Sequence, residues 1–263
     1  MRVSDWIDLS GKTAHVTGAG RGIGAGIARA LAAAGAGVVV SDIDTASAAA
    51  VAEEIGGVSM VLDVSDREAV DAALAETVER QGSLDIMVNN AGVYDGYGGS
   101  VRDITDEMWR GLWSVNVDGL FYCCRAAARL MIEAGRGGRI INIGSTAAVT
   151  PGVGVTYDGS KAAVAMITKA LALELAPHKI NVNTLAPGPT RVMEGEPPPV
   201  DGHPPPPTGN PLADTVADRI ARLPLGHWGD PMEQGKAAVF LASAMSDFVT
   251  GIYLPVDGGW LTL

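Results

Sequence analysis

A phenol and an ammonium stand four positions apart in the stretch TYDGSK, as Tyr157 and Lys161. Four residues make about one helical turn, so both side chains would lie on one face of a helix. Alone, neither group titrates near neutral pH, since a free phenol has a pKa of about 10 and a free lysine one of about 10.4. The pair is either an ordinary amphipathic surface or a proton-transfer site in which the ammonium lowers the pKa of the phenol toward the working pH.

The elements that would position this pair alternate along all 263 residues. Short apolar runs rich in β-branched residues are separated by Ala-rich stretches of helical character. Near-continuous apolar strands between helices predict a parallel sheet covered on both faces. With right-handed crossovers, this is an α/β fold with one doubly wound, Rossmann-type sheet of seven strands. The strands are expected at 13–17, 37–41, 58–62, 84–89, 138–144, 179–185 and 251–256, with helices between them that include 106–134, 155–177 and 231–243.

One segment interrupts the alternation, the proline-rich EGEPPPVDGHPPPPTGNP at 194–211. Its prolines exclude sheet and long helix. No internal repeat or linker divides residues 1–263, so we expect a single dinucleotide-binding domain. A loop after the sixth strand emerges beside the crevice at the carboxyl ends of the strands, so we expect a substrate lid over about 190–226. A disordered surface insertion is the alternative.

A glycine-rich turn, VTGAGRGIG at 16–24, joins the first strand to the first helix. Gly18, Gly22 and Gly24 would allow a sharp turn and the close approach of a ligand. The helix N-terminus would offer free N–H groups and a positive dipole end to a pyrophosphate. The turn therefore predicts a nucleotide site, although a tight structural turn has the same glycine content.

The second strand ends at Asp42, close to where dinucleotide folds place an acid on the adenosine ribose. A carboxylate there accepts hydrogen bonds from the ribose hydroxyls and repels a 2′-phosphate, which predicts NAD as the cofactor rather than NADP. Two observations leave this open. Asp42 or Asp44 could cap the next helix instead, and the cation of Arg21 could accommodate a phosphate.

Composition excludes several classes of function. The net charge of −11 disfavours nucleic acid and anionic membranes as partners, since both require a basic face. The start has no signal-peptide pattern, and the apolar runs are too short to span a bilayer. The only cysteines, Cys123 and Cys124, are adjacent, and the four histidines are scattered. We expect a cytoplasmic protein without a structural metal.

Eight motifs in order resemble the short-chain dehydrogenase/reductase family over essentially the whole chain. They are TGAGRGIG, LDVSD, NNAG, VNVDG, INIGS, YDGSK, NVNTLAPG and VDGGW. The resemblance implies an NAD(P)-dependent oxidoreductase of alcohols and carbonyls, and in most members a homotetramer. The apolar residues of the helix at 155–177 agree with an extra interface, because they cover more surface than one sheet face would bury.

The resemblance also implies residue roles. Tyr157 would be the catalytic acid/base with Lys161 as its partner, Ser145 would position the substrate oxygen, and Asn116 would hold a water in a proton relay. Tyr157 and Lys161 would also contact the cofactor. The other implied cofactor residues are Gly18, Arg21, Gly22, Ile23, Gly24, Asp42, Asp63, Val64, Asn90, Ala91, Gly92, Pro187, Gly188 and Thr190.

The chain departs from the family pattern at two places. Ser145 precedes Tyr157 by 12 positions, where many relatives have one more. Val192 stands where relatives often place a threonine that binds the nicotinamide carboxamide, and Thr190 is the candidate substitute. Tyr94 and Tyr97 follow the NNAG motif and either line the substrate entrance or lie on the surface.

These observations favour an NAD-dependent oxidoreductase that interconverts a small secondary alcohol and its ketone by hydride transfer. An NADPH-dependent 3-oxoacyl-thioester reductase is one alternative, against which Asp42 counts. A non-catalytic cofactor-binding scaffold is the other, against which the intact set of Ser145, Tyr157 and Lys161 counts.

Overall fold

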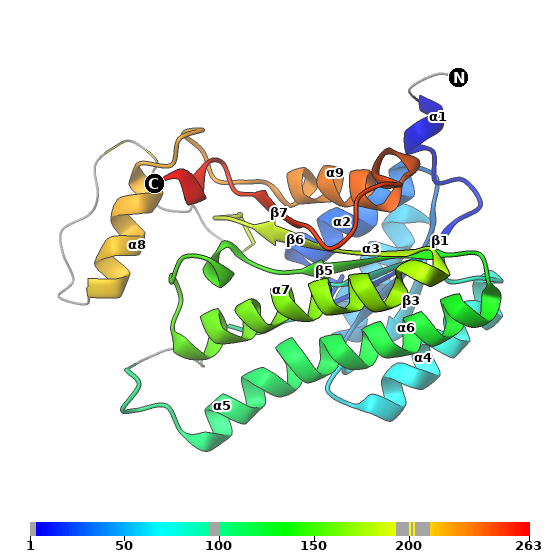
Figure 1. Cartoon of the computed structure of the whole chain (residues 1–263), viewed down its shortest axis with the longest axis horizontal. Coiled ribbons are helices and arrows are strands. Elements are labelled where there is room, and N and C mark those ends of the chain that lie inside the picture. Colours follow the sequence, from blue (N-terminus) through cyan, green and yellow to red (C-terminus); the bar gives the residue numbers. More distant parts are fainter. Residues whose placement is uncertain (1–3, 95–99, 193–199, 201, 203–210) are drawn as a thin grey trace.

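Seven parallel strands form one sheet at the centre of the molecule (Figure 1). The computed structural model describes residues 4–94, 100–192, 200, 202 and 211–263. The strand order, β3-β2-β1-β4-β5-β6-β7, confirms the predicted doubly wound, Rossmann-type sheet. The strands are β1 (Thr13–Thr17), β2 (Gly37–Asp42), β3 (Val58–Val61), β4 (Ile86–Asn89), β5 (Gly138–Ile143), β6 (Ile180–Pro187) and β7 (Tyr253–Val256).

Helices cover both faces of this sheet. α2, α3 and α9 pack on one face, and α4, α6 and α7 pack on the other (Figure 1). No helix in the described part of the chain is both long enough and apolar enough to cross a membrane. The helices are α1 (Ser4–Ile7), α2 (Gly22–Ala33), α3 (Thr45–Ile55), α4 (Arg67–Gln81), α5 (Asp106–Trp113), α6 (Leu120–Ala134), α7 (Val155–Leu175), α8 (Pro211–Ala221) and α9 (Pro231–Ala242), with short 3₁₀ turns at Thr146–Ala148, Ala176–His178, Ala244–Ser246 and Trp260–Thr262.

Two hydrophobic clusters, one on each face, form the core. Val38 and Val40 of β2 enter the cluster beneath α2 and α9, whereas Val39 enters the cluster beneath α4 and α6. This split follows the pleat, because successive side chains of a strand point to opposite faces. Apolar residues on both sides of each strand explain why the sequence reads as continuous apolar runs.

The sheet changes its direction of progress at β1, which pairs with β2 on one side and with β4 on the other. Loops leaving the carboxyl ends of β1 and β4 therefore run to opposite sides, and the crevice between them is the usual ligand site of such folds. The candidate residues Gly18, Asp42, Asn90 and Ser145 all lie at or just after the carboxyl ends of strands.

The long helix predicted near 106–134 is interrupted. α5 ends at Trp113, Ser114–Gly119 form a π-helical turn, and α6 begins at Leu120. A π-turn accommodates an extra residue and is frequent at functional sites. Here it carries Asn116. The structure also adds α8, where no helix was predicted; the proline at its first position is a usual start signal.

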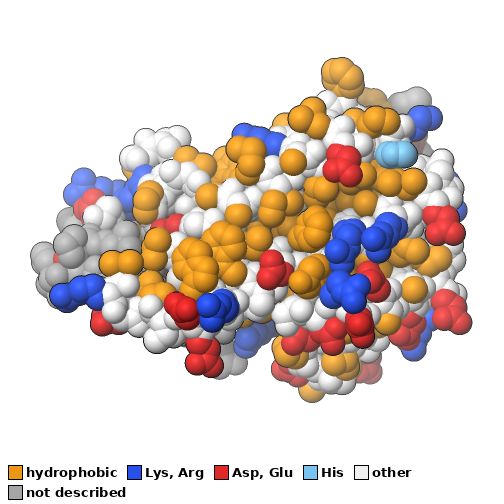
Figure 2. All heavy atoms as spheres, turned by 60° about the horizontal axis from the view of Figure 1, so that its bottom comes forward, with side chains coloured by type: hydrophobic (Ala, Val, Ile, Leu, Met, Phe, Trp, Pro, Cys, Tyr) orange, Lys and Arg blue, Asp and Glu red, His pale blue; other side chains and the backbone are white. Residues whose placement is uncertain are grey.

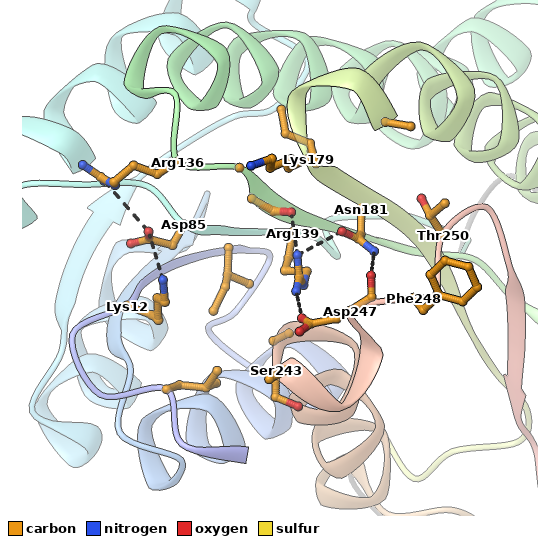
Figure 3. Close-up of a pocket in the computed structure, with 18 of the residues that line it drawn as sticks. Lys12, Asp85, Arg136, Arg139, Lys179, Asn181, Ser243, Asp247, Phe248 and Thr250 are labelled. Carbon is orange, nitrogen blue, oxygen red and sulfur yellow. Dashed lines mark hydrogen bonds and ion pairs between the residues drawn. The ribbon is translucent and has the colours of Figure 1, made fainter. Parts of the chain in front are cut away.

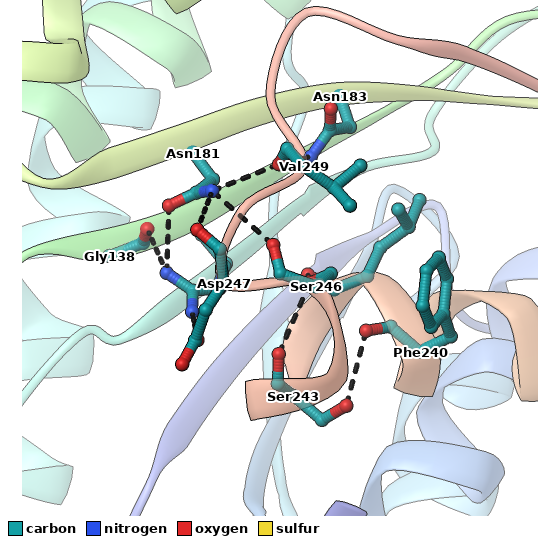
Figure 4. A network of polar contacts seen from close by, with 10 residues as sticks. Gly138, Asn181, Asn183, Phe240, Ser243, Ser246, Asp247 and Val249 are labelled. Carbon is teal, nitrogen blue, oxygen red and sulfur yellow. Dashed lines mark hydrogen bonds and ion pairs between the residues drawn. The ribbon is translucent and has the colours of Figure 1, made fainter. Parts of the chain in front are cut away.

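Two asparagines of β6 fasten the segment that leads into β7 (Figure 4). Asn181 and Asn183 each donate an Nδ2 hydrogen to the carbonyl oxygen of Val249, both at 2.9 Å. Asn183 also accepts the backbone N–H of Ile252 at its Oδ1, 3.2 Å away. These bonds at the core edge fix where β7 begins, and so fix the position of Tyr253.

Candidate active site

Three of the predicted chemical groups meet at the carboxyl end of β5. Tyr157 and Lys161 come from the first two turns of α7, and Ser145 lies two residues beyond β5. The Ser145 hydroxyl forms a hydrogen bond with Tyr157. The Lys161 Nζ lies 5.6 Å from the centre of the Tyr157 ring and donates to the Ile143 carbonyl oxygen at 3.0 Å. A carbonyl or hydroxyl oxygen placed near Tyr157 would therefore be within reach of a second donor, Ser145.

Ser145 also caps the 3₁₀ turn at Thr146–Ala148, because its Oγ accepts the backbone N–H of Ala147 at 3.1 Å. Ser145 therefore caps this turn and contacts Tyr157 as well. The spacing of 12 positions, shorter than in many relatives, does not prevent that contact.

An acid in the first turn of α7 shapes the loop before the helix. The Asp158 carboxylate accepts the backbone N–H groups of Gly152, Val153 and Gly154 at 3.2–3.3 Å. A carboxylate at a helix N-terminus is favoured by the helix dipole. The contact fixes the direction in which α7 begins, and Tyr157 is the neighbouring residue.

The expected lowering of the Tyr157 pKa is wrong for the chain by itself. Burial is the main cause that raises the pKa of the phenol to about 12. The Ser145 hydrogen bond acts against this rise, and the nearby Asp158 carboxylate adds to it. Burial also lowers the pKa of Lys161 to about 8. Removal from water disfavours both charged forms, and this effect outweighs the attraction between the ammonium and the phenolate.

Asn116 in the π-turn ties the strand loop after β4 to α7. Its side chain accepts the Val93 N–H at 2.8 Å and donates to the Val93 carbonyl at 2.9 Å and to the Ser160 hydroxyl at 3.2 Å. A Cβ on Gly92 would lie 3.3 Å from Asn116 Oδ1 and 3.6 Å from Lys161 Nζ. The amide, the ammonium and Gly92 therefore border one another.

The glycine-rich turn packs tightly against the loop after β4. Gly18 has a φ of +60°, and a Cβ there would come within 2.7 Å of the Ala91 Cα. A Cβ on Gly24 would come within 2.3 Å of the Gly18 carbonyl oxygen. Asn90 donates its Nδ2 hydrogens to the carbonyls of Thr17 (2.9 Å) and Gly18 (2.8 Å). These contacts place the turn, Asn90 and Ala91 side by side.

Asp42 lies at the carboxyl end of β2, facing the same turn. Its Oδ2 accepts the Gly20 N–H at 2.9 Å and its Oδ1 accepts the Asp44 N–H at 3.0 Å. It is Asp44 that caps α3, through the N–H groups of Ala46 and Ser47. Hydrogen bonds from Ser47 lower the pKa of Asp44 most, and the charge of Arg21 adds a smaller lowering, so a carboxylate lies near the cation expected beside the adenosine.

Three more of the implied cofactor residues, Asp63, Val64 and Ile23, make contacts within the protein. Asp63 accepts the N–H and hydroxyl of Ser65, and the Val64 side chain is buried against Gly119. Ile23 packs against the core cluster beneath α2.

Thr190 turns its hydroxyl toward α9. The hydroxyl donates to the Gly188 carbonyl at 2.9 Å and accepts from Gln234 at 3.2 Å. These bonds disfavour Thr190 as a side-chain substitute for the threonine missing at Val192. Gly188 continues the ladder from Pro187 by donating its N–H to the Val256 carbonyl at 3.1 Å, which fixes this turn at the carboxyl end of β6.

Two more tyrosines surround Tyr157. The Tyr94 ring meets it edge to face at a centre distance of 6.2 Å, which supports the interpretation of Tyr94 as a lining residue, whereas Tyr97 lies outside the described residues. Tyr253 donates its hydroxyl to the Ser145 carbonyl oxygen. Sequence analysis missed Tyr253, because 108 positions separate the two residues and no local pattern marks the contact.

A separate cavity of about 710 Å³ opens at the opposite end of the sheet (Figure 3). Its lining includes Asp85, Arg139 and Asp247, near the amino-terminal ends of β4, β5 and β7. Arg139 binds Asp247 at 2.5 Å and donates to Asn181 Oδ1 at 3.0 Å. These charged groups hold strands and loops together, away from the carboxyl ends where Tyr157 lies.

Known proteins are similar to this chain in sequence and in fold. The family model described as Enoyl-(Acyl carrier protein) reductase matches residues 18–261. A sorbitol dehydrogenase of Cereibacter sphaeroides is 39% identical over 97% of this chain and 99% of its own. The crystal structure of a short-chain type dehydrogenase/reductase from Mycobacterium marinum is 35% identical, with a TM-score of 0.85 over 99% of both chains. The chain belongs to the short-chain dehydrogenase/reductase family.

The dehydrogenase is thus an NAD(P)-dependent oxidoreductase of secondary alcohols, which confirms the predicted class of enzyme. A gluconate 5-dehydrogenase from Burkholderia cenocepacia, solved in complex with NADP and tartrate, is 36% identical, with a TM-score of 0.85 over the whole of both chains.

The crevice of the dehydrogenase fits a dinucleotide. Arg21 is the N-cap residue of α2, and its side chain makes no capping hydrogen bond. The first N–H groups of α2 are therefore available to a pyrophosphate. At Gly18 and Gly24 a Cβ would collide with the neighbouring backbone, so only glycine allows the turn to pack this closely. The residues that would hold the cofactor are those of this turn, Asp42, Asn90 to Gly92 and the Pro187–Gly188 backbone.

Proposed function

We propose that the protein is an NAD-preferring dehydrogenase that interconverts a secondary alcohol and a ketone on a small polyhydroxylated molecule. The observation that carries the proposal is the meeting of Ser145, Tyr157 and Lys161 at the carboxyl end of β5. The names of the relatives, a sorbitol dehydrogenase and a gluconate 5-dehydrogenase, support a hydroxyl-rich substrate.

The side chains divide the proton chemistry among them. A bound nicotinamide would supply or accept the hydride. Tyr157 takes the hydroxyl proton during oxidation and returns a proton to the ketone oxygen during reduction. Ser145 donates to the same oxygen and stabilises the charge that develops on it. Lys161, protonated below its pKa of about 8, provides positive charge beside the phenol, and Asn116 would hold a water that renews the proton.

The preference for NAD rests on Asp42. A 2′-phosphate would lie against this carboxylate, and the charge of Arg21 also acts on the neighbouring exposed Asp44. The adjacent N–H groups of Gly20 and Asp44 use one acceptor direction of each Asp42 oxygen, which leaves the others for ribose hydroxyls. One relative was solved in complex with NADP, so the fold by itself does not exclude that cofactor, and the proposed preference depends on Asp42.

We also propose a substrate lid over about 190–226 in the single domain 1–263. Residues 193–199, 201 and 203–210 lie outside the described residues, and α8 follows them. A Cβ on Gly152 would lie 4.0 Å from the Val216 side chain of α8. Gly152 belongs to the loop that Asp158 shapes beside Tyr157, so α8 lies at the substrate end of the crevice.

A homotetramer in the cytoplasm is the proposed assembly. The face formed by α5, α6 and α7 gathers hydrophobic side chains on the surface (Figure 2). Met166 and Leu173 of α7 are 63% and 82% exposed, and Trp109 and Phe121 are also exposed. Apolar surface of this kind marks protein–protein contacts, and a second copy is the natural partner in closed symmetry.

The test compares both cofactors on a panel of sugar alcohols, aldonic acids and 3-oxoacyl thioesters. We expect kcat/KM with NAD to exceed that with NADP by at least about tenfold, and Asp42→Asn to remove most of that difference by neutralising the carboxylate. Glu54→Gln is the matched control, since it removes the same charge from the exposed ion pair between Glu54 on α3 and Arg29 on α2.

Each other outcome has a definite meaning. Preference for NADP by the wild type would contradict the cofactor proposal. Faster turnover of thioesters than of polyols would favour the alternative, a 3-oxoacyl-thioester reductase. Binding of NADH with no turnover anywhere on the panel would indicate a cofactor-binding scaffold.

A further inference from the structure

A series of contacts that starts at Asn181 and Asn183 of β6 fixes the position of Tyr253. The asparagines of β6 bind the segment before β7 (Figure 4), and Tyr253 then pairs with Thr184 as the first residue of β7. Thr184 pairs in turn with Asn142 of β5. Tyr253 therefore stands two strands away from β5, in a fixed register and on the edge strand of the sheet.

A glycine opens the path between Tyr253 and the end of β5. A Cβ on Gly144 would lie 2.6 Å from the Thr184 methyl group and 3.7 Å from Cε2 of the Tyr253 ring. Since no side chain occupies that space, the ring reaches across β6 and its hydroxyl donates to the Ser145 carbonyl oxygen. The sequence INIGS thus places a glycine where the ring passes and a serine where the hydroxyl arrives.

The Ser145 peptide has a second donor on the same oxygen. The N–H of Ala148 donates to the Ser145 carbonyl at 2.9 Å, and the N–H of Ala147 donates to the Ser145 Oγ at 3.1 Å. Both of these bonds lie within the 3₁₀ turn and would move with it. Only the Tyr253 hydroxyl, among the bonds described for this carbonyl, links it to the sheet.

We propose that Tyr253 is a positioning residue that fixes the Ser145 peptide, so that the Ser145 hydroxyl points at Tyr157 and the reacting oxygen. The proposal deepens the proposed function, since it assumes the roles given there to Ser145 and Tyr157. Tyr253 acts through Ser145 and itself transfers no proton. Its protonation state agrees with this role. Burial, together with the nearby Asp257 carboxylate, raises the pKa of Tyr253 to about 12, so its hydroxyl keeps its proton and can donate it in a hydrogen bond.

The test is a double-mutant cycle on kcat, with the alcohol of the panel that the wild type oxidises fastest. We expect Tyr253→Phe to lower kcat about three- to tenfold, the range for one neutral hydrogen bond, with substrate KM changed less than twofold. In a Ser145→Ala background the same change should have no further effect on kcat, because the hydroxyl that Tyr253 orients is gone. Tyr122→Phe on α6 removes a hydroxyl from another partly buried tyrosine and should leave kcat unchanged.

The pH profile separates positioning from general stabilisation. The charged and titratable groups that face Tyr157 are Asp158 and Lys161 of α7, Tyr94 of the loop after β4 and Tyr253 of β7. Since the Ser145 hydrogen bond lowers the Tyr157 pKa, a less ordered Ser145 should move the limb of kcat that reports the acid/base to higher pH. An unshifted limb, or an equal loss of kcat in the Ser145→Ala background, would overturn the proposal.

A readout without turnover keeps the two proposals apart. Amide hydrogen exchange at Ala147 and Ala148 should be several times faster in Tyr253→Phe than in the wild type, because the carbonyl that anchors their turn has lost its tie to the sheet. If the wild type oxidises nothing on the panel while exchange quickens, the proposed function fails and the role of Tyr253 in fixing Ser145 stands. Unchanged exchange in an active, folded Tyr253→Phe variant would show that Ser145 needs no such support.

Discussion

The protonation state of Tyr157 depends on its burial and on its contacts with Ser145 and Lys161. With a pKa of about 12 in the chain, the phenol is protonated at neutral pH, which suits a proton donor to a ketone. To act as a base it needs positive charge nearby, and within the chain Lys161 provides it. Ser145 is the contact that already lowers the pKa of the phenol. Burial and hydrogen bonding therefore pull the pKa of this residue in opposite directions.

Replacing Tyr157 with phenylalanine should remove the proton transfer and little else. We expect kcat to fall by ~10²–10⁴-fold, the usual contribution of a positioned acid/base. The ring keeps its edge-to-face contact with Tyr94, so the affinity for NADH should change less than threefold. Steady-state kinetics and fluorescence titration with NADH measure the two effects. A variant that retains more than a tenth of wild-type kcat would mean that the phenol is not the acid/base.

Lys161 should lose its proton far earlier than a surface lysine. Burial without an anionic partner lowers its pKa from 10.5 to about 8. NMR titration of the lysine side chains in the cofactor-free protein should therefore show one lysine with a midpoint near pH 8, and Lys161→Met should delete that signal. Lys169, exposed on the same helix, is the internal comparison through Lys169→Met. A Lys161 signal with a midpoint above pH 10 would contradict the role of burial.

At the scale of elements, polar side chains inside the sheet join strands to helices. His15 of β1 is fully buried and lies 2.8 Å from the hydroxyls of both Ser41 in β2 and Thr77 in α4. Burial lowers its pKa from 6.5 to about 4. A neutral ring can satisfy both hydroxyls, whereas a protonated ring would carry an uncompensated charge between the strands.

Acid should therefore weaken the fold through His15. The unfolded chain takes up a proton at this residue below pH 6.5, and the folded chain does so only near pH 4, so stability falls as the pH drops between these values. The difference of about 2.5 units corresponds to about 3 kcal/mol of unfolding free energy. Urea unfolding at pH 7.5 and pH 4.5 measures it, with His15→Gln expected to flatten the dependence and the exposed His178→Gln expected to keep it. Parallel pH profiles for wild type and His15→Gln would rule this out.

Elements were predictable where one pattern decides them, and contacts were not. The apolar runs specified the seven strands within one or two residues, and the spacing of Tyr157 and Lys161 specified one helix face. The π-turn escaped prediction, because no residue type in Ser114–Gly119 distinguishes it from a regular turn of the long helix predicted there. Tyr253 and the pKa of Tyr157 escaped it for another reason: each depends on burial and on partners far away in the sequence.

At the scale of the whole molecule, the two ends of the sheet have different tasks. The amino-terminal end holds Arg139, Asn181 and Asp247 in bonds that stabilise the strands, with the cavity of about 710 Å³ among them (Figure 3). The carboxyl-terminal end holds the candidate catalytic residues. Changes at the first end should therefore affect unfolding more than catalysis, except where they reach β7 and Tyr253.

Assembly should cover the apolar face of α5, α6 and α7 (Figure 2). Sedimentation at micromolar concentration should give the mass of four chains of 27.0 kDa each. Met166→Asp and Leu173→Asp, which put charges on the two most exposed apolar positions of α7, should shift the protein to smaller species without lowering its helix content. Val61→Asp puts the same charge on a similarly exposed apolar residue of the edge strand β3, outside this face, and serves as the control. A monomeric wild type would end the tetramer proposal.

The π-helical turn at Ser114–Gly119 also sets the relative phase of the two helices that it joins. Each residue of an α-helix rotates the chain by about 100°, and a π-turn absorbs one residue more than a regular turn. Loss of a single residue here would let α5 and α6 merge into one regular helix, with the residues on one side of the loss rotated against those on the other. Trp113 would then turn away from Gly159 of α7, and Asn116 would turn away from Val93. Insertions and deletions in this stretch should thus be as damaging as substitutions, which makes its length a constraint on how the chain can evolve.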